Sequence, residues 1–226
     1  MFSWIHNPHF SWYSHLFAVS GSGKTRLSLE GLCLNWGFYI SCRPGSATEI
    51  GGSRDFVDTG DTMKTSKDWN DTDQNQNTDI AQRVFAMLLC ARFFVLQSLL
   101  KKLPPGADAM IARRRWVLLQ VVPPFVADLD IFSSVLKRLL RADAAVMNEV
   151  TRTIFKNLPD IREDIFPSGE KLFVVVDEAQ QAVEYLKQSF PSATGSEKHP
   201  ILYPFYAFLW NAGYFRGSFL PELVYR

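Results

Sequence analysis

The stretch that decides the fold, residues 18–25, reads Ala18-Val19-Ser20-Gly21-Ser22-Gly23-Lys24-Thr25. The apolar run Leu16-Phe17-Ala18-Val19 overlaps its start and is typical of a short strand. A helical pattern follows from Lys24 to Trp36, and Gly37 stands where a helix C-terminal cap is expected. The next five residues, Phe38-Tyr39-Ile40-Ser41-Cys42, predict a second strand. Strand, glycine turn, helix and strand make a βαβ unit, whose strands should be parallel and whose crossover should be right-handed.

The octapeptide has the P-loop pattern, except that Ala18 replaces the first glycine of that pattern. Gly21 and Gly23 allow backbone torsions that a Cβ would forbid, so that successive N–H groups can turn toward a phosphate. The positive end of the following helix favours the same anion. Lys24 is expected to reach the β- and γ-phosphates, and the Thr25 hydroxyl to bind Mg²⁺. The alternative is a glycine-serine turn that happens to precede Lys-Thr, and the strand before it and the helix after it favour the phosphate site.

A second motif, Leu172-Phe173-Val174-Val175-Val176-Asp177-Glu178, is a hydrophobic strand that ends in two acids. Ligands of parallel α/β sheets bind at the carboxyl ends of the strands. Asp177 is therefore expected to hold Mg²⁺, directly or through water, and Glu178 to orient and polarise the attacking water. The alternative is an exposed acidic pair that caps the next helix. Gln180 is a candidate γ-phosphate contact, with a solvated helix position as its alternative.

These two motifs give the candidate site. The expected catalytic residues are Lys24 and Glu178, and the expected metal ligands are Thr25 and Asp177. The expected nucleotide-binding residues are Ser20, Gly21, Ser22, Gly23, Lys24, Thr25 and Arg26. The cofactors implied are ATP and Mg²⁺.

The predicted fold class is α/β: a P-loop-type parallel sheet flanked by helices, with a large helical insertion between the P-loop unit and the Asp177-Glu178 strand. A single domain over residues 1–226 is expected. Residues 43–79 are predicted to be a flexible polar insertion, because residues 44–79 hold eight acids and three bases, a balance of −5, and few apolar side chains. Helices are predicted at 79–102, 107–120, 129–141, 144–158, 178–189 and 202–215.

The composition excludes several classes of protein. Hydrophobic residues are 47% and charged residues 21% of the 226, which excludes a wholly disordered chain. The net charge of +1 supplies no overall field for nucleic acid or acidic lipid. Three cysteines at no ligand-like spacing indicate reduced thiols, and no signal peptide is apparent at the N-terminus. The most apolar stretch, 84–100, is interrupted by Arg92 and Gln97 and favours a buried or amphipathic helix over a membrane span. An intracellular protein, in cytoplasm or nucleus, is expected.

Three stretches together resemble the P-loop ATPase module of large fungal proteins related to Crinkler-type effectors, which are AAA- and STAND-like. They are residues 20–26 running into Glu30-Gly31-Leu32-Cys33, residues 35–39, and residues 171–180. Trp116 to Gln120 with Pro123-Pro124 is also similar. The resemblance implies an additional-strand ATPase, coupled in its relatives to partner or nuclease modules, although no nuclease is apparent in this sequence. A protein partner or self-association is expected. Such modules continue past the Asp-Glu strand to a sensor strand, and Pro221 ends the run 217–220 where that strand would continue, so a shortened C-terminus is expected.

The function predicted is Mg²⁺-dependent ATP binding, with ATP hydrolysis if the fold is complete enough. One alternative is a nucleotide switch or degenerate remnant that does not hydrolyse ATP. Another is a helicase-like, nucleic-acid-dependent ATPase, suggested by Asp177-Glu178-Ala179-Gln180, although no clear nucleic-acid surface and no membrane partner are expected. Arg113-Arg114-Arg115 could touch nucleic acid or serve as an arginine finger, with a solvated helix face as the alternative.

Overall fold

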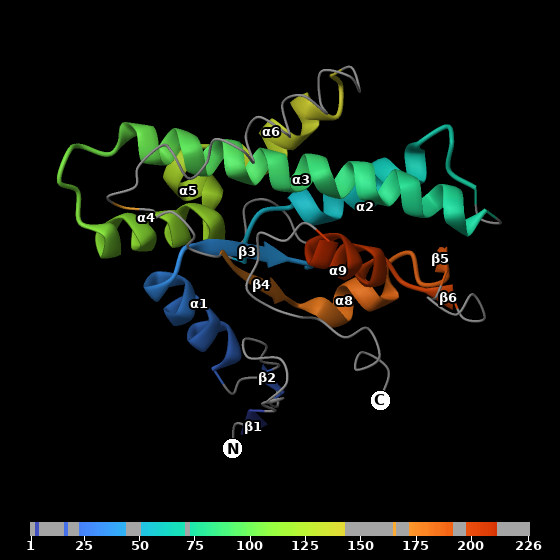
Figure 1. The fold of residues 1–226 in the computed structure, drawn as a ribbon, viewed down its shortest axis with the longest axis horizontal. Helices are drawn as coiled ribbons and strands as arrows, with labels where there is room; N and C mark the ends of the chain where they lie inside the picture. Colours follow the sequence, from blue (N-terminus) through green and yellow to red (C-terminus); the bar gives the residue numbers. More distant parts are fainter. Residues whose placement is uncertain are drawn as a thin grey trace.

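The computed structural model describes residues 3–4, 16–17, 23–43, 51–70, 73–142, 165, 172–191 and 198–211 (Figure 1). This part of the chain is mostly helical around a short parallel pair of strands. In chain order the elements are β1 (Ser3–Trp4), β2 (Leu16–Phe17), α1 (Lys24–Leu34), β3 (Gly37–Ser41), α2 (Asp55–Thr65), α3 (Gln74–Lys102), α4 (Ala109–Val121), α5 (Pro123–Ala127), α6 (Ile131–Leu139), β4 (Phe173–Asp177), α8 (Ala179–Glu184), β5 (Phe190–Pro191), β6 (Lys198–His199) and α9 (Leu202–Asn211).

The strands β3 and β4 pair in parallel, with Gly37 opposite Phe173 and Ser41 opposite Asp177. Every residue of β3 is buried, as expected for a parallel strand covered on both faces. Side chains alternate along a strand, so Tyr39 lies on one face of β3 and its neighbours Phe38 and Ile40 lie on the other. Phe38 and Ile40 join the main core, whereas Tyr39 packs in a smaller cluster with Leu32 of α1. The pair of strands therefore separates α1 from the main core.

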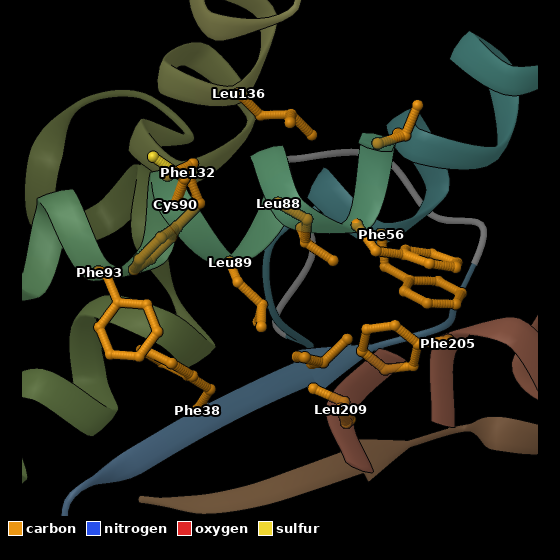
Figure 2. Close-up of a cluster of buried hydrophobic side chains, with 14 of the residues drawn as sticks. Phe38, Phe56, Leu88, Leu89, Cys90, Phe93, Phe132, Leu136, Phe205 and Leu209 are labelled. Atoms are coloured by element: carbon orange, nitrogen blue, oxygen red, sulfur yellow. The ribbon is translucent and has the colours of Figure 1, made fainter. Parts of the chain in front are cut away.

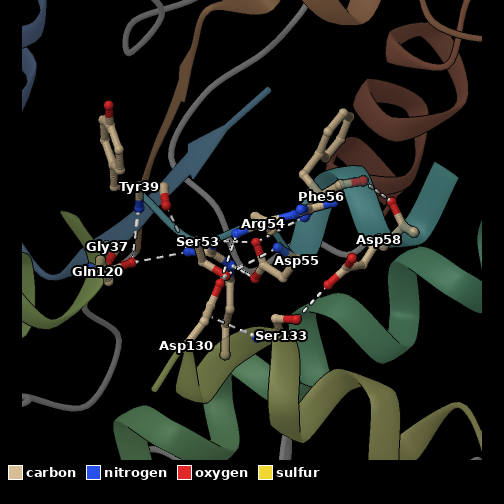
Figure 3. Close-up of polar contacts among 12 residues, drawn as sticks. Gly37, Tyr39, Ser53, Arg54, Asp55, Phe56, Asp58, Gln120, Asp130 and Ser133 are labelled. Carbon is tan, nitrogen blue, oxygen red and sulfur yellow. Dashed lines mark hydrogen bonds and ion pairs between the residues drawn. The ribbon is translucent and has the colours of Figure 1, made fainter. Parts of the chain in front are cut away.

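In the part of the chain that the structure describes, side chains rather than a third strand bind the edge of β3 opposite β4. Trp116 Nε1 and Gln120 Nε2 of α4 donate to the Gly37 carbonyl, at 2.7 Å and 3.2 Å. Gln120 Oε1 accepts from the Tyr39 N–H at 2.9 Å, and Arg92 Nη1 of α3 donates to the Tyr39 carbonyl at 2.7 Å (Figure 3). These bonds satisfy the backbone groups that would otherwise pair with a neighbouring strand. Among the described strands, β3 is therefore the last one on this side of the sheet.

Helix α3 forms the centre of the main core and crosses beside the β3–β4 pair (Figures 1 and 2). Phe93 of α3 meets Phe38 edge to face at 4.9 Å between ring centroids, and Phe85 meets Phe205 of α9 at 4.9 Å. Helix α3 is long and apolar enough to cross a membrane, but most of its apolar stretch is buried inside the protein. Such burial is typical of the core helix of a soluble protein. The prediction of a buried helix over this stretch is confirmed.

The two ends of α3 show how far its bounds could be predicted. The predicted end at Lys102, before Pro104, is confirmed. The predicted start at Asp79 is five residues late. Asp73 is the N-cap instead, because its side chain accepts the N–H of Gln76 at 3.0 Å.

The interpretation of residues 43–79 as a polar insertion outside the core is wrong for residues 51–70. Residues 55–65 form α2, and Phe56 and Met63 of this helix are buried in the main core. The number of acids suggested a solvated segment, but Asp55 and Asp58 are buried with polar partners. Arg92 forms an ion pair with Asp55. The Ser133 hydroxyl donates to the Asp58 carboxylate at 2.5 Å (Figure 3). A buried carboxylate with donors in place no longer favours solvent. Residues 44–50 and 71–72 lie outside the described residues.

The remaining predictions have mixed outcomes. Helices α4, α6 and α9 match the predicted ones to within a few residues, and α2 to α6 lie between β3 and β4 in the chain, as the predicted helical insertion requires. The predicted helix 178–189 ends at Glu184.

The strand pairing differs from the predicted βαβ unit. The segment Leu16–Phe17 (β2) pairs antiparallel with β1 and does not form the predicted parallel pair with β3. The parallel partner of β3 is β4. The predicted helix 144–158 and the run 217–220 lie outside the described residues. A wider P-loop-type sheet stays a prediction.

Gly37→Ala is expected to destabilise the protein by about 1–3 kcal/mol, the usual range for overpacking. A Cβ on Gly37 would stand 2.1 Å from the Phe173 carbonyl oxygen and 2.8 Å from Leu32 Cδ2. The Phe173 backbone cannot easily retreat, because its N–H donates to the Trp36 carbonyl at 2.8 Å. Urea unfolding followed by circular dichroism measures the change.

Gly31→Ala is the matched control for this substitution. Its added Cβ would meet Phe173 Cε1 at 3.7 Å, which is an ordinary contact. Alanine in a helix interior is favoured over glycine by about 0.5–1 kcal/mol. Equal stability changes in the two variants would contradict the close approach of β3 and β4 at Gly37.

Candidate functional site

Two segments that are far apart in the chain meet where α1 begins and β4 ends. Thr25 Oγ1, in the first turn of α1, donates to Asp177 Oδ2 at 3.3 Å, across 152 positions of sequence. Thr25 comes from the glycine-rich motif and Asp177 from the acidic strand end. The structure therefore brings one residue of each predicted motif into direct contact.

The start of α1 is set by Gly23. This residue has φ 85° and ψ 16°, a left-handed conformation that glycine adopts without steric cost. Gly23 is the N-cap of α1, and glycine has no side chain with which to cap the N–H groups of the first turn. These groups and the positive end of the helix dipole lie next to Thr25. The local chemistry suits an anion.

Asp177 is held in place by three donors. Oδ2 accepts from Thr25 and from the Tyr39 hydroxyl, the latter at 2.5 Å, and Oδ1 accepts from the Glu178 N–H at 3.1 Å. An ionised carboxylate offers about four lone-pair positions, so three are used and one remains. A hydroxyl that donates its proton still keeps two lone pairs. Thr25 and Asp177 can therefore contact each other and still each offer an oxygen to a cation.

Tyr39 reaches Asp177 from an apolar cluster. Tyr39 is 2% exposed, and its ring packs with Leu32 and Val117. Burial, and after it the hydrogen bond to Asp177, raises the pKa of the Tyr39 hydroxyl well above its usual value. The hydroxyl is therefore protonated throughout the physiological range and serves as a donor.

Glu178 follows directly in an unusual backbone conformation. Its φ of 56° and ψ of 34° lie in the left-handed region, which costs a non-glycine residue about 1–2 kcal/mol. Such strain occurs more often at functional sites than elsewhere. The Glu178 carboxylate accepts from the amide of Gln180, so these two candidate residues bind each other.

The other predicted site residues are placed as follows. Lys24 is the first residue of α1, and its side chain lies outside the description, as do Ser20, Gly21 and Ser22. Arg26 is exposed and pairs with Glu30 at 2.8 Å, one turn further along α1. Glu30 raises the pKa of Arg26 through this hydrogen bond and its charge. The Arg26 guanidinium thus lies on the surface of α1, bound to Glu30.

The basic run 113–115 lies away from this site. Arg113 Nε donates to the Cys33 carbonyl at 3.3 Å, in the last turn of α1. Cys33 is eight residues from Thr25, or about 12 Å along the helix axis. Arg113 thus binds the end of α1 opposite to Thr25, where it satisfies a terminal carbonyl.

The donor set fits Mg²⁺. The Thr25 hydroxyl and the Asp177 carboxylate are hard oxygen ligands, and proteins commonly bind Mg²⁺ through one or two carboxylates together with substrate phosphates. Within the described residues, no group of three or more His, Cys, Asp or Glu side chains could hold a metal by itself. These two oxygen ligands therefore suit a metal ion that is also bound by nucleotide phosphates. They are too few for a site in which protein side chains alone bind the metal.

Sequence reasoning missed the residues that support Asp177. The sequence pattern predicts a strand at Tyr39 and a helix at Gln120, and it assigns neither residue a role at the site. The register explains the role of Tyr39, because Tyr39, Ser41, Val175 and Asp177 alternate onto one face of the paired strands. Arg92 gives a signal for Gln120, because a charge within a long apolar helix must find partners and Gln120 Oε1 is one of them.

Comparison with known proteins adds no relative to this description: no family model, no curated protein and no solved structure matches the chain.

Proposed function

We propose that the protein binds a nucleoside triphosphate, ATP, together with Mg²⁺ at the start of α1. The observation that carries the proposal is the 3.3 Å contact between Thr25 Oγ1 and Asp177 Oδ2. A hydroxyl at the start of a helix that follows a glycine-rich turn, beside a carboxylate at the end of a parallel strand, is the arrangement expected for a phosphate-bound Mg²⁺ site. The first turn of α1 supports the same ligand, because its N-cap Gly23 has no capping side chain and N–H groups at a helix start favour a phosphate.

The proposed roles follow from this chemistry. Lys24 and the backbone of residues 21–25 bind the phosphate oxygens, and Thr25 and Asp177 hold the metal. Bound Mg²⁺ would neutralise charge on the phosphates. In hydrolysis, Glu178 accepts a proton as the oxygen of a water attacks the γ-phosphorus. The bond from this phosphorus to the bridging oxygen breaks, and ADP leaves.

Isothermal titration calorimetry with ATP, with and without Mg²⁺, tests the binding proposal. ATP should bind with Mg²⁺ and bind more weakly in EDTA, since both Thr25 and Asp177 act through the metal. GTP, titrated in the same way, shows whether the base matters. A chain that binds neither nucleotide in either buffer would exclude the proposed function.

Glu178→Gln is expected to keep Mg-ATP binding and to lower phosphate release by about 10²–10⁴-fold, the usual contribution of a general base. The amide keeps the size of the side chain but accepts no proton. Glu184→Gln is the matched control, because Glu184 lies on the same helix and is exposed with Lys187 as its partner. Phosphate release in Glu178→Gln equal to that of Glu184→Gln would remove Glu178 from the mechanism.

A nucleotide switch without hydrolysis is the second candidate. It is favoured by the contact between the Gln180 amide and the Glu178 carboxylate, which engages the proposed base. ATP binding without phosphate release by the wild-type protein would support this function. The resemblance to Crinkler-type modules adds the proposal that nucleotide binding controls self-association or a protein partner, which light scattering with and without Mg-ATP would test.

A further inference from the structure

Tyr39 is placed against the same carboxylate oxygen as Thr25. Its hydroxyl donates to Asp177 Oδ2 at 2.5 Å, and Thr25 donates to that oxygen at 3.3 Å. Tyr39 belongs to β3 and Asp177 to β4, and the alternation along the paired strands puts both side chains on the face that α1 covers. The shorter of the two contacts is the one from Tyr39.

The position of Tyr39 is fixed from several sides. Gln120 binds its N–H and Arg92 its carbonyl, so α4 and α3 both hold its backbone. The ring is buried with Leu32. Gly52 lies close to the ring on another side, since a Cβ added to it would stand 3.0 Å from Tyr39 Cε1. A side chain held in this way can present its hydroxyl in one place without a further loss of entropy when a ligand binds.

We propose that Tyr39 is a positioning residue that sets the Mg²⁺ affinity of the nucleotide site by fixing the carboxylate of Asp177. The inference rests on the proposed function. With Tyr39 and Thr25 on Oδ2 and the Glu178 N–H on Oδ1, the carboxylate has one orientation and about one free lone-pair position. Tyr39 touches neither nucleotide nor metal and acts through Asp177. Hydrogen-bond partners of metal ligands commonly change metal affinity by about 10–100-fold when they are removed.

The test is Tyr39→Phe, which removes the hydroxyl and keeps the buried ring. Mg²⁺ is titrated at fixed ATP and the binding heat is recorded, so that turnover is not needed. The apparent Mg²⁺ affinity should fall by about tenfold or more. ATP affinity in EDTA should stay at the wild-type value, because Tyr39 has no part in the phosphate contacts proposed for the start of α1. A fall in both affinities together would indicate loss of folding or of the whole site, and would overturn the positioning role.

Tyr185→Phe is the matched control. The Tyr185 hydroxyl also donates to a carboxylate, that of Asp61 in α2, and neither residue is part of the proposed site. The control should leave the Mg²⁺ and ATP affinities unchanged. An equal loss in both variants would show a general effect of removing a tyrosine hydroxyl and would contradict the proposal.

A double-mutant cycle tests the route through Asp177. Asp177→Asn should weaken Mg²⁺ binding by itself, and Tyr39→Phe should add no further loss in that background. Additive losses would overturn the inference, since Tyr39 would then act elsewhere. If wild-type protein binds Mg-ATP and Tyr39→Phe matches it, only this inference fails. If the wild-type protein binds no ATP, the proposed function itself fails.

Discussion

Asp55→Ala is expected to lower the free energy of unfolding by about 3–5 kcal/mol, the usual cost of breaking a buried ion pair. Arg92 Nε and Nη2 donate to the two carboxylate oxygens of Asp55, each at 2.7 Å, and both side chains are fully buried. Without Asp55 the Arg92 charge would remain in the core with only the Tyr39 carbonyl and Gln120 as acceptors. For a chain of this length the midpoint of thermal unfolding should fall by roughly 6–20 °C.

The exposed pair Arg26–Glu30 supplies the control for this experiment. Its side chains are 84% and 54% exposed, so solvent screens the pair and Glu30→Ala should leave the stability nearly unchanged. Differential scanning calorimetry on both variants compares them directly. A shift for Asp55→Ala as small as that for Glu30→Ala would mean that Arg92 and Asp55 are not paired in the core.

Removing Asp55 is expected to lower the free energy of unfolding mainly because it leaves the buried Arg92 charge without its carboxylate. The intact ion pair itself stabilises the fold much less than this loss suggests. Burial raises the pKa of the Asp55 carboxyl, and the Arg92 guanidinium opposes this shift. Desolvation therefore offsets much of the attraction between the two charges. The pair nevertheless fixes α3 against α2, and through the Tyr39 carbonyl it fixes α3 against β3. A stability defect at Asp55 should thus also loosen the strand that carries Tyr39.

Lys24→Ala is expected to weaken Mg-ATP binding by about 100-fold or more. A hydrogen bond to a charged group contributes about 1.5–3 kcal/mol, and the P-loop pattern predicts that Lys24 contacts two phosphates. Three kcal/mol corresponds to a factor of about 100 in the dissociation constant. Calorimetry measures the affinity, and circular dichroism verifies that the variant is folded.

Lys101→Ala controls for the loss of one positive charge. Lys101 is exposed in the last turn of α3, and no part of the proposed site includes it. Its replacement should leave ATP affinity unchanged. Wild-type affinity in Lys24→Ala would refute the role assigned to the lysine, and would favour a glycine-serine turn that only resembles a phosphate site.

The sequence predicted the elements that carry the candidate site to within a few residues. The helix that starts at Lys24 and the strand that ends at Asp177 are present. The expected cap at Gly37 is wrong, because Asn35 is the C-cap of α1 and Gly37 is already the first residue of β3. Each of these elements is a local pattern: glycine permits the turn, a short apolar run favours a strand, and an acid ends it. Strand β3 is buried along its whole length, whereas Phe173 of β4 is exposed and the rest of β4 is half-buried. The two motifs are predicted to share one ligand, and the structure places Thr25 Oγ1 3.3 Å from Asp177 Oδ2. The shared ligand itself stays a prediction.

The polar partners in the core could not be predicted in the same way. Counting acids in residues 44–79 suggested a solvated segment, whereas Asp55 is fully buried because Arg92, 37 residues later, reaches it. Composition carries no information on which charges will meet. The same holds for Gln120, whose amide takes the place of a neighbouring strand along β3.

The sequence by itself determined where α1, β3 and β4 lie and which oxygen atoms are suited to a metal, because these follow from short-range periodicity and from the chemistry of a few adjacent residues. Only the tertiary structure decided that Tyr39 supports Asp177 and that Arg92 closes the edge of β3. Those contacts depend on the parallel register of two strands more than 130 residues apart and on the packing of α3 and α4 against them. A hydrogen bond of this kind forms only after the core has placed its donor within reach of its acceptor.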